Sequence, residues 1–132
     1  MSEHHIKGMT ENPRPTNLVL HQKSRVLEIL FDDGSQFNLP CEYLRVFSPS
    51  AEVQGHGPGQ AVLMVGKEMV NIAAIEPVGN YAIKLVFDDK HDSGLFSWSY
   101  LHWLGSNYEE NWATYLGRLA EVGYKRKDIA PE

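Results

Sequence analysis

The sequence predicts an α+β fold, in which a mainly antiparallel sheet is packed by a C-terminal amphipathic helix and by short helices. The main observation is a repeat. Residues 25–44 and 82–101 each contain an alternating apolar strand, Phe-Asp-Asp and a turn, a short return strand, and then Tyr-Leu. A second observation is the apolar periodicity of a helix near the C-terminus. We therefore expect two related hairpin units, with Phe31 and Phe87 in equivalent places of one core.

The first hairpin unit follows a polar segment, residues 1–15, which we expect to be flexible and to be neither a signal peptide nor a membrane anchor. A strand is expected over 16–21. Alternation over 26–31 predicts a second strand with one fully apolar face. An Asp-Gly turn leads into a return strand over 36–39. Pro40 suits the first position of a short helix, where its missing N–H is not needed.

The second hairpin unit is expected to begin with strands over 70–77 and 81–87, joined across a Gly-Asn turn. Leu95 begins the return strand, and Ser97 is expected to cap a short helix that ends near Gly105. The residues expected to share one face of the second of these strands are Tyr81, Ile83, Leu85 and Phe87.

The last element is the clearest helix. Asn107 is expected as its N-cap, with Glu110 reaching back as in a capping box, and Gly123 fits the position after its end. The remaining residues, 124–132, read as a basic and polar tail that is solvated and complements the helix dipole. The apolar stripe expected to face the core is Tyr108, Trp112, Tyr115, Leu116, Leu119 and Val122.

Composition limits the class of protein. A length of 132 residues suits one domain, which we place at residues 16–123. The formal net charge of −5 argues against nucleic acid or an anionic membrane as the partner. The single cysteine, Cys41, excludes an intrachain disulfide and favours the cytoplasm. It reads as a small buried hydrophobe rather than a nucleophile.

Histidines and carboxylates gather in a glycine-rich stretch, about residues 48–67, and in one acidic turn, which suggests metal ligation. His91 lies in the turn 88–93 between Asp89 and Asp92, and these groups suit a divalent iron or zinc ion. His56 and Glu52 lie in the glycine-rich stretch and are the further candidate ligands. The alternative is structural, with the aspartates forming Asx turns and His91 bonded locally.

Known catalytic motifs do not fit this chain. No histidine is followed two residues later by an acid, and no His-Glu-x-x-His is present. Gly59 and Gly66 imitate a phosphate loop, but their spacing is too long and Glu68 stands where Ser or Thr would bind Mg²⁺. The sequence therefore favours a protein without catalytic activity over an enzyme that uses the same histidines and carboxylates as acid and base.

Four segments in register resemble a known family, the γ-butyrobetaine hydroxylase-like N-terminal domain, formerly DUF971, in its stand-alone bacterial form. They read LPCEYLR (39–45), SPSAEVQGH (48–56), IEPVGNY (75–81) and HDSGLFSW (91–98). The resemblance extends over about residues 16–123. Related domains fused to P-loop ATPases with iron–sulfur clusters imply an accessory role near metal-cofactor assembly.

The resemblance also implies a zinc site that this chain lacks. In the hydroxylases of carnitine synthesis, the domain precedes an oxygenase barrel and holds structural zinc through three cysteines and one histidine. The cysteines follow the segment matching residues 43–45, where this chain has Val-Phe-Ser-Pro. Only His91 matches the histidine, so we expect the family zinc site and the barrel to be missing.

Two functional hypotheses follow. The first is a non-catalytic interaction module for a protein partner, linked to metal-cofactor or iron–sulfur protein assembly, and the alternative is a metal-binding protein that uses His91 and the nearby carboxylates. We expect the glycine-rich stretch to lie beside the acidic turn and to form the partner surface. The residues expected on this surface are Ser48, Ser50, Glu52, Gly55, His56 and Gln60.

Overall fold

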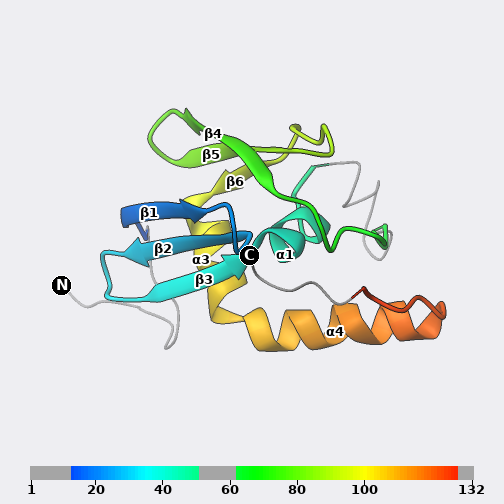
Figure 1. Cartoon of the computed structure of the whole chain (residues 1–132). Helices are drawn as coiled ribbons and strands as arrows, with labels where there is room; N and C mark the ends of the chain where they lie inside the picture. The colour runs from blue at the N-terminus through cyan, green and yellow to red at the C-terminus, as the bar shows by residue number, and fades with distance from the viewer. Residues whose placement is uncertain (1–12, 51–61, 128–132) are drawn as a thin grey trace.

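Two three-stranded antiparallel sheets form the fold, one from each hairpin unit (Figure 1). The computed structural model describes residues 13–50 and 62–127. The first unit consists of β1 (Pro15–His21), β2 (Val26–Phe31), β3 (Gln36–Pro40) and α1 (Cys41–Val46). The second consists of β4 (Ile72–Val78), β5 (Ala82–Phe87), β6 (Leu95–Ser97), α3 (Trp98–Ser106) and α4 (Tyr108–Glu121). The predicted α+β class is confirmed, with each unit forming its own sheet.

The two turns of the repeat have the same backbone structure. The Phe31 carbonyl accepts a hydrogen bond from the Gly34 N–H at 3.0 Å, and the Phe87 carbonyl accepts one from the Lys90 N–H at 3.1 Å. Gly34 and Lys90 both have positive φ, at 87° and 74°. The outer strands β1 and β4 each contain a register shift. The shift follows Pro15, which pairs with Phe31, and Ile72, which pairs with Phe87. Phe31 and Phe87 are both buried in one core, so their predicted equivalence is confirmed.

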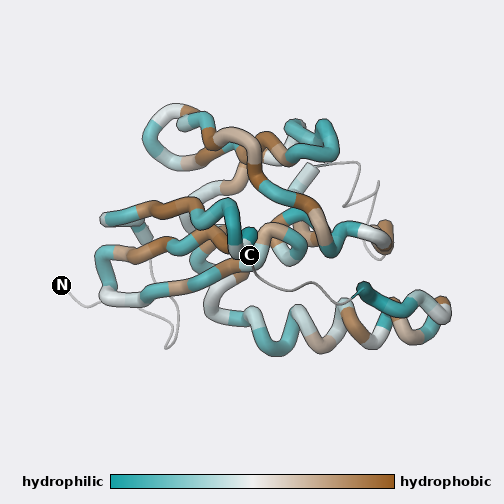
Figure 2. The backbone as a smooth tube through the Cα atoms, viewed as in Figure 1, coloured by the Kyte–Doolittle hydropathy of each residue, from teal (hydrophilic) through white to brown (hydrophobic). Residues whose placement is uncertain are grey.

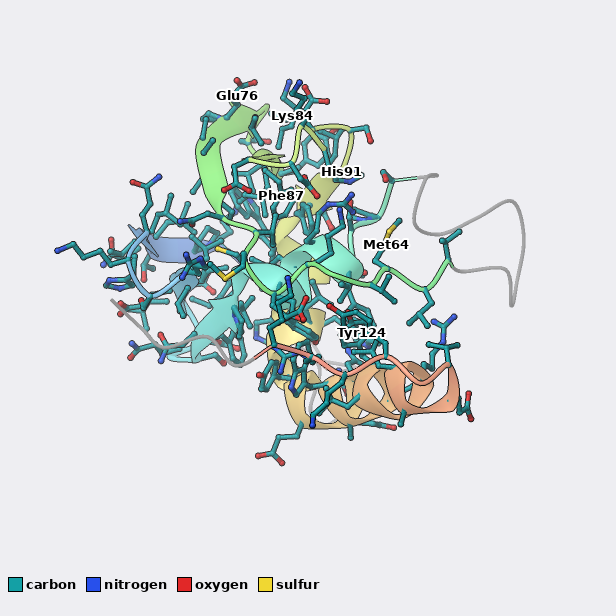
Figure 3. All side chains as sticks on the ribbon, turned by 45° about the vertical axis from the view of Figure 1, so that its right-hand side comes forward. Met64, Glu76, Lys84, Phe87, His91 and Tyr124 are labelled. Carbon is teal, nitrogen blue, oxygen red and sulfur yellow. The ribbon has the colours of Figure 1, made fainter. Side chains whose placement is uncertain are left out.

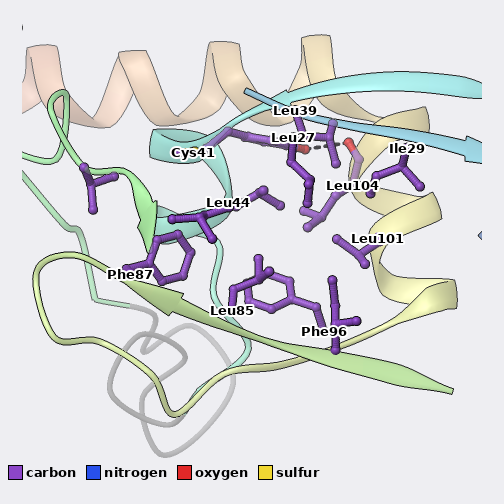
Figure 4. Packing of buried hydrophobic residues seen from close by; sticks show 14 of the residues in the cluster. Leu27, Ile29, Leu39, Cys41, Leu44, Leu85, Phe87, Phe96, Leu101 and Leu104 are labelled. Atoms are coloured by element: carbon purple, nitrogen blue, oxygen red, sulfur yellow. Dashed lines mark hydrogen bonds between the residues drawn. The ribbon is translucent and has the colours of Figure 1, made fainter. Parts of the chain in front are cut away.

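The hydrophobic core lies where the two sheets meet α1 and α3. Figure 4 shows side chains from β2, β3, β5 and β6 packing with those of both helices. Figure 2 shows the hydrophobic stretches along the strands and the alternation of hydrophobic and hydrophilic residues along α4. The largest fully buried side chains are Tyr43, Phe31, Phe87, Phe96, Leu27, Ile29, Leu39, Leu44, Ile72, Leu85, Leu101 and Leu104.

Two tyrosines connect the units reciprocally. The Tyr43 hydroxyl donates to the Leu104 carbonyl at 2.7 Å, and the Tyr100 hydroxyl donates to the Phe47 carbonyl at 2.6 Å. Leu104 comes four residues after Tyr100, and Phe47 comes four residues after Tyr43. The two units are therefore related by an approximate twofold axis that exchanges α1 with α3.

Two expectations about strand ends were wrong. Pro40 is the last residue of β3 and the N-cap of α1, not the first helical residue, because its extended ψ of 143° still belongs to the strand. Tyr81 precedes β5 and is 57% exposed, so it does not share the buried face of Ile83 and Leu85.

The caps of α3 and α4 differ. Ser97 accepts a hydrogen bond from the Tyr100 N–H at 3.1 Å and caps α3 as predicted. Asn107 makes no side-chain cap for α4, because its amide donates back to the Trp103 carbonyl at 2.9 Å. The predicted capping box is therefore wrong. Gly123 has the expected positive φ of 76° directly after Val122, the C-cap of α4.

Helix α4 buries a narrower stripe than the sequence predicted. Tyr115 and Leu119 are buried, whereas Leu116 is 38% exposed and Val122 is 62% exposed. Across the described residues, every helix is too short or too polar to cross a bilayer.

Residues 124–127, the described part of the predicted tail, are bound to the fold, which corrects the expectation of a solvated segment for these residues. The Arg126 guanidinium binds the buried Glu42 carboxylate and lies 5.3 Å from the centre of the Trp112 ring. The Tyr124 hydroxyl donates to Glu68 at 2.6 Å. Two buried carboxylates therefore hold this part of the chain in place.

Candidate functional site

The turn aspartate of each unit pairs with a helix of the other unit. Asp33 lies 2.9 Å from His102 Nε2 on α3, and Asp89 lies 2.8 Å from Arg45 Nε on α1. Arg45 comes two positions after Tyr43, and His102 comes two positions after Tyr100. Lys67 adds a second cation at 2.7 Å from the same oxygen of Asp89. These contacts follow the approximate twofold axis and therefore connect the two units.

The Asp89 carboxylate is fully engaged in this structural role. Oδ2 accepts from Arg45 and Lys67, and Oδ1 accepts from the His91 N–H at 3.2 Å. Burial raises the pKa of Asp89, but the hydrogen bonds from Lys67 and Arg45 outweigh this effect and lower the pKa below its usual value. The carboxylate is therefore ionised and paired at neutral pH.

The twofold relation is broken where His91 stands. In the first unit the ring of Phe37 lies 5.9 Å from that of Phe31, and in the second the ring of His91 lies 6.0 Å from that of Phe87. Figure 3 shows His91 beside Phe87 on the upper part of the molecule. Phe37 and His91 come from different positions of the repeat, since the Phe31 N–H donates to the Ser35 carbonyl where the Phe87 N–H donates to the His91 carbonyl. A polar ring therefore packs on Phe87 where an apolar ring packs on Phe31.

Two serines satisfy this buried histidine. His91 Nε2 lies 2.9 Å from the Ser48 hydroxyl and 3.3 Å from the Ser50 hydroxyl. The start of the glycine-rich stretch therefore lies beside the acidic turn, as expected. All three side chains are buried, so Ser48 and Ser50 do not present hydroxyls to a partner, contrary to the expectation for these two residues.

Metal ligation stays a prediction. The candidates Glu52 and His56 lie outside the described residues, as do the surface residues Gly55 and Gln60. Asp92 is exposed in the turn. Within residues 13–50 and 62–127, no three groups from His, Cys, Asp and Glu converge in a way that could hold a metal.

Cys41 is fully buried, as the sequence predicted. Burial raises the pKa of its thiol to about 11, so it stays protonated at neutral pH. Its thiol lies 3.7 Å from the Asn71 amide oxygen, and the side chain packs in the core. Cys41 is therefore a protonated, buried core side chain.

An apolar cleft of about 470 Å³ opens between the end of α1, α3 and α4. Its aromatic wall contains Tyr100 and Trp103, whose rings stack 5.9 Å apart at 12°. Trp103 and Val62 are 48% and 46% exposed. The described residues that line it are Val46, Phe47, Pro49, Val62, Leu63, Met64, Tyr100, Trp103, Thr114, Tyr115 and Arg118.

The wall formed by residues 62–64 is fastened to α4. The Tyr115 hydroxyl donates to the Met64 carbonyl at 2.7 Å, and burial raises the pKa of Tyr115, which keeps this donor protonated. Val46 packs against Tyr115 and Leu119 at the base. Figure 3 shows Met64 above the C-terminal half of α4. The cleft is therefore preformed rather than dependent on a ligand.

The sequence did not predict this cleft, because its lining comes from segments that lie far apart along the chain. A signal was available in the helical spacing. Leu101 and Leu104 form the buried face of α3, and Trp103 falls between them on the opposite side. A large apolar side chain on an exposed helix face marks a candidate binding surface.

The chain belongs to the gamma-butyrobetaine hydroxylase-like N-terminal family, whose family model matches residues 18–102. A solution NMR structure is 52% identical, with 97% of this chain and 96% of that chain covered and a TM-score of 0.77. A second NMR structure is 45% identical, with coverages of 91% and 95% and a TM-score of 0.77. The expected family is therefore confirmed.

A crystal structure from Acidithiobacillus ferrooxidans shows the same relationship. It is described as a protein with unknown function of the DUF971 family. It is 36% identical, with 70% of this chain and 92% of that chain covered and a TM-score of 0.60. The comparison with curated proteins found no match.

Proposed function

We propose that the protein is a non-catalytic interaction module that binds a protein partner in the cleft beside Trp103. The observation that carries this proposal is the exposure of Trp103 and Val62 on the walls of a preformed apolar cleft. Exposed apolar surface of this kind is typical of binding sites, and tryptophan is enriched among the residues that contribute most to protein association.

The chemistry of the cleft supports binding rather than catalysis. Its described lining residues supply the hydroxyl of Thr114 and the guanidinium of Arg118 to an otherwise aliphatic and aromatic surface. They supply no carboxylate, imidazole or thiol, which are the usual groups for proton transfer or nucleophilic attack. The metal-binding alternative gains no support from Asp89, whose oxygens are already engaged.

The cellular setting is proposed from the sequence and the family. The single cysteine is buried in the reduced form and supports a reducing compartment such as the cytoplasm. The family resemblance supports a role near metal-cofactor or iron–sulfur protein assembly, by association only.

The test is affinity capture from native lysate with three single variants. Trp103→Ser and Val62→Ser change exposed residues of the cleft, and Tyr81→Ser is the matched control because it removes an exposed aromatic residue from the β4–β5 hairpin. We expect a partner that the wild type and Tyr81→Ser retain and that both cleft variants lose. A partner retained equally by all four proteins would contradict the proposal, provided that amide spectra show each variant folded.

A further inference from the structure

Residues 124–127, which follow α4, contact the stretch of chain that carries one wall of the cleft. After α4 the chain turns back along this helix, as Figure 1 shows. The Tyr124 hydroxyl and the Lys127 N–H both donate to Oε2 of Glu68, at 2.6 Å and 2.8 Å. Glu68 comes four residues after Met64, which lines the cleft. The C-terminal segment and the cleft wall are therefore joined through one short stretch of chain.

The Glu68 carboxylate depends on this segment for its partners. Glu68 is only 4% exposed, so its carboxylate needs hydrogen-bond donors within the fold. Burial raises the pKa of Glu68, but hydrogen bonds from Tyr124 and from the N–H groups of Lys127 and of Glu68 itself, together with the charge of Arg126, lower this pKa below its usual value. Three of these four stabilising groups belong to residues 124–127. Without them the carboxylate would have to turn toward water, because an unpaired buried charge is costly.

Tyr124 also packs with the wall of the cleft. Its hydroxyl lies 3.9 Å from the place that a Cβ would take on Gly66, which stands between Met64 and Glu68. Gly66 has a φ of 75°, a conformation that glycine adopts without steric cost, so the chain bends here. Departure of Tyr124 would remove the contact at this bend and a packing partner of the buried cluster that also holds Leu63 and Met64. The buried residues of that cluster are Val46, Tyr115 and Leu119.

We propose that residues 124–127 form a clasp that controls partner binding in the cleft. This inference rests on the proposed function and names a regulation of the same site. With the clasp bound to Glu68, the wall at residues 62–64 is held in its binding position. With the clasp released, Glu68 turns to solvent, the wall loosens and the cleft binds the partner weakly. Because such coupling is reciprocal, a partner in the cleft stabilises the bound clasp to the same extent.

The clasp is tested first in the free protein. Tyr124→Phe removes only the hydroxyl that binds Glu68, and Tyr81→Phe is the matched control because it removes the hydroxyl of an exposed tyrosine. The labelled methyl group of Met64 reports on the wall, and the Lys127 amide reports on the clasp. We expect Tyr124→Phe to shift the Met64 signal and to speed exchange of the Lys127 amide by about tenfold, and Tyr81→Phe to change neither.

A second variant acts on the acceptor. Glu68→Gln keeps the size of the side chain but removes the charge that strengthens both hydrogen bonds, so it should loosen the Met64 signal and the Lys127 amide in the same direction. If both reporters stay as in the wild type in Tyr124→Phe and in Glu68→Gln, the clasp does not hold the wall and the proposal is overturned.

Partner binding is then compared by affinity capture from native lysate. The partner that the wild type and Tyr81→Phe retain should be largely lost from Tyr124→Phe and Glu68→Gln. Full retention by variants whose wall has loosened would overturn the clasp and leave the proposed function standing. Failure of the wild type to capture any partner at the cleft would instead overturn the proposed function, while the Met64 and Lys127 measurements still decide whether the clasp holds the wall.

Discussion

The ring of Phe37 packs directly on Gly105, so that a Cβ at Gly105 would lie 2.3 Å from the ring. The twofold-related contact joins Gly94 to Ser48, where a Cβ at Gly94 would lie 2.3 Å from the hydroxyl. The strand pairing places Phe37 and Gly94 at equivalent positions of the two units. Ser48 and Gly105 are also equivalent, because each comes five residues after the reciprocal tyrosine of its unit. Glycine thus occurs once in each contact, on opposite partners.

Gly105→Ala should destabilise the protein by about 2 kcal/mol or more, because the added methyl group overlaps a packed ring. The matched control is Gly117→Ala in α4, where a Cβ meets no atom within 4 Å. That variant should raise the free energy of unfolding by about 0.5–1 kcal/mol through helix propensity. Urea unfolding of the two variants measures both effects. If both variants changed the free energy of unfolding equally, the ring of Phe37 would be able to move away from the added methyl group.

Tyr43→Phe should lower the free energy of unfolding by about 1–3 kcal/mol, because the buried Leu104 carbonyl and the Asn111 amide lose their hydroxyl partner. Tyr100→Phe removes the inter-unit hydrogen bond to the Phe47 carbonyl at a half-buried site, and a smaller loss is expected. Tyr81→Phe is the exposed control and should change the free energy by less than about 0.5 kcal/mol. Chemical denaturation of the three variants gives the order, and the reverse order for Tyr43 and Tyr100 would contradict the account.

Asp89→Asn should destabilise the protein by about 2–3 kcal/mol at pH 7, because it leaves Arg45 buried without its carboxylate. The folded-state pKa of Asp89 is lowered, so its contribution is full above the usual aspartate pKa and is lost as pH falls through the folded value. The difference between wild type and variant should therefore narrow below about pH 4.

Urea unfolding of both proteins between pH 7 and pH 3 measures this difference. Asp92→Asn, an exposed change in the same turn, serves as the control and should track the wild type at every pH. A difference between wild type and Asp89→Asn that stays constant with pH would show that the carboxylate contributes through its shape rather than its charge.

Arg126→Ala should destabilise the protein by about 2–3 kcal/mol, since it leaves the buried Glu42 carboxylate unpaired and removes the cation over Trp112. Lys125→Ala changes the neighbouring exposed residue and should have an effect within about 0.5 kcal/mol. Thermal and urea unfolding compare the two. Equal stabilities would mean that the contacts of Arg126 with Glu42 and Trp112 do not contribute to stability.

His91 and Ser48 should be coupled in a double-mutant cycle. His91→Phe gives the second unit the kind of ring that Phe37 provides in the first, and Ser48→Ala removes the hydroxyl 2.9 Å from Nε2. We expect a coupling free energy of about 1 kcal/mol, since both changes remove the same buried hydrogen bond. Additive single changes would contradict the role of this pair.

The repeat in the sequence predicted the two units and the equivalence of Phe31 and Phe87, because strand alternation and turn residues are local properties. The ends of elements were less predictable. Asn107 has a good capping side chain, but the nearby Trp103 carbonyl competes for its amide. Tyr81 continues the alternation of β5 in sequence. It still belongs to the turn that precedes β5, however, and so it lies outside the sheet.

Long-range contacts account for what the sequence could not predict. The Arg126 pair joins the end of the chain to Glu42, and no local pattern links these positions. The cleft exists because residues 62–64 line one hollow together with residues of α1, α3 and α4, which only the folded arrangement reveals. The helical spacing places Trp103 away from the buried face of α3, but the amino-acid type alone favours a core position for tryptophan.

The most direct test of the central claim is photocrosslinking in living cells, with a benzophenone amino acid at position 103 and, as the control, at position 81. Both positions are exposed aromatic residues, but only position 103 lines the cleft. We predict a discrete crosslinked protein from position 103 that does not form from position 81. The same products from both positions, or none from position 103 in the folded protein, would contradict partner binding at this cleft.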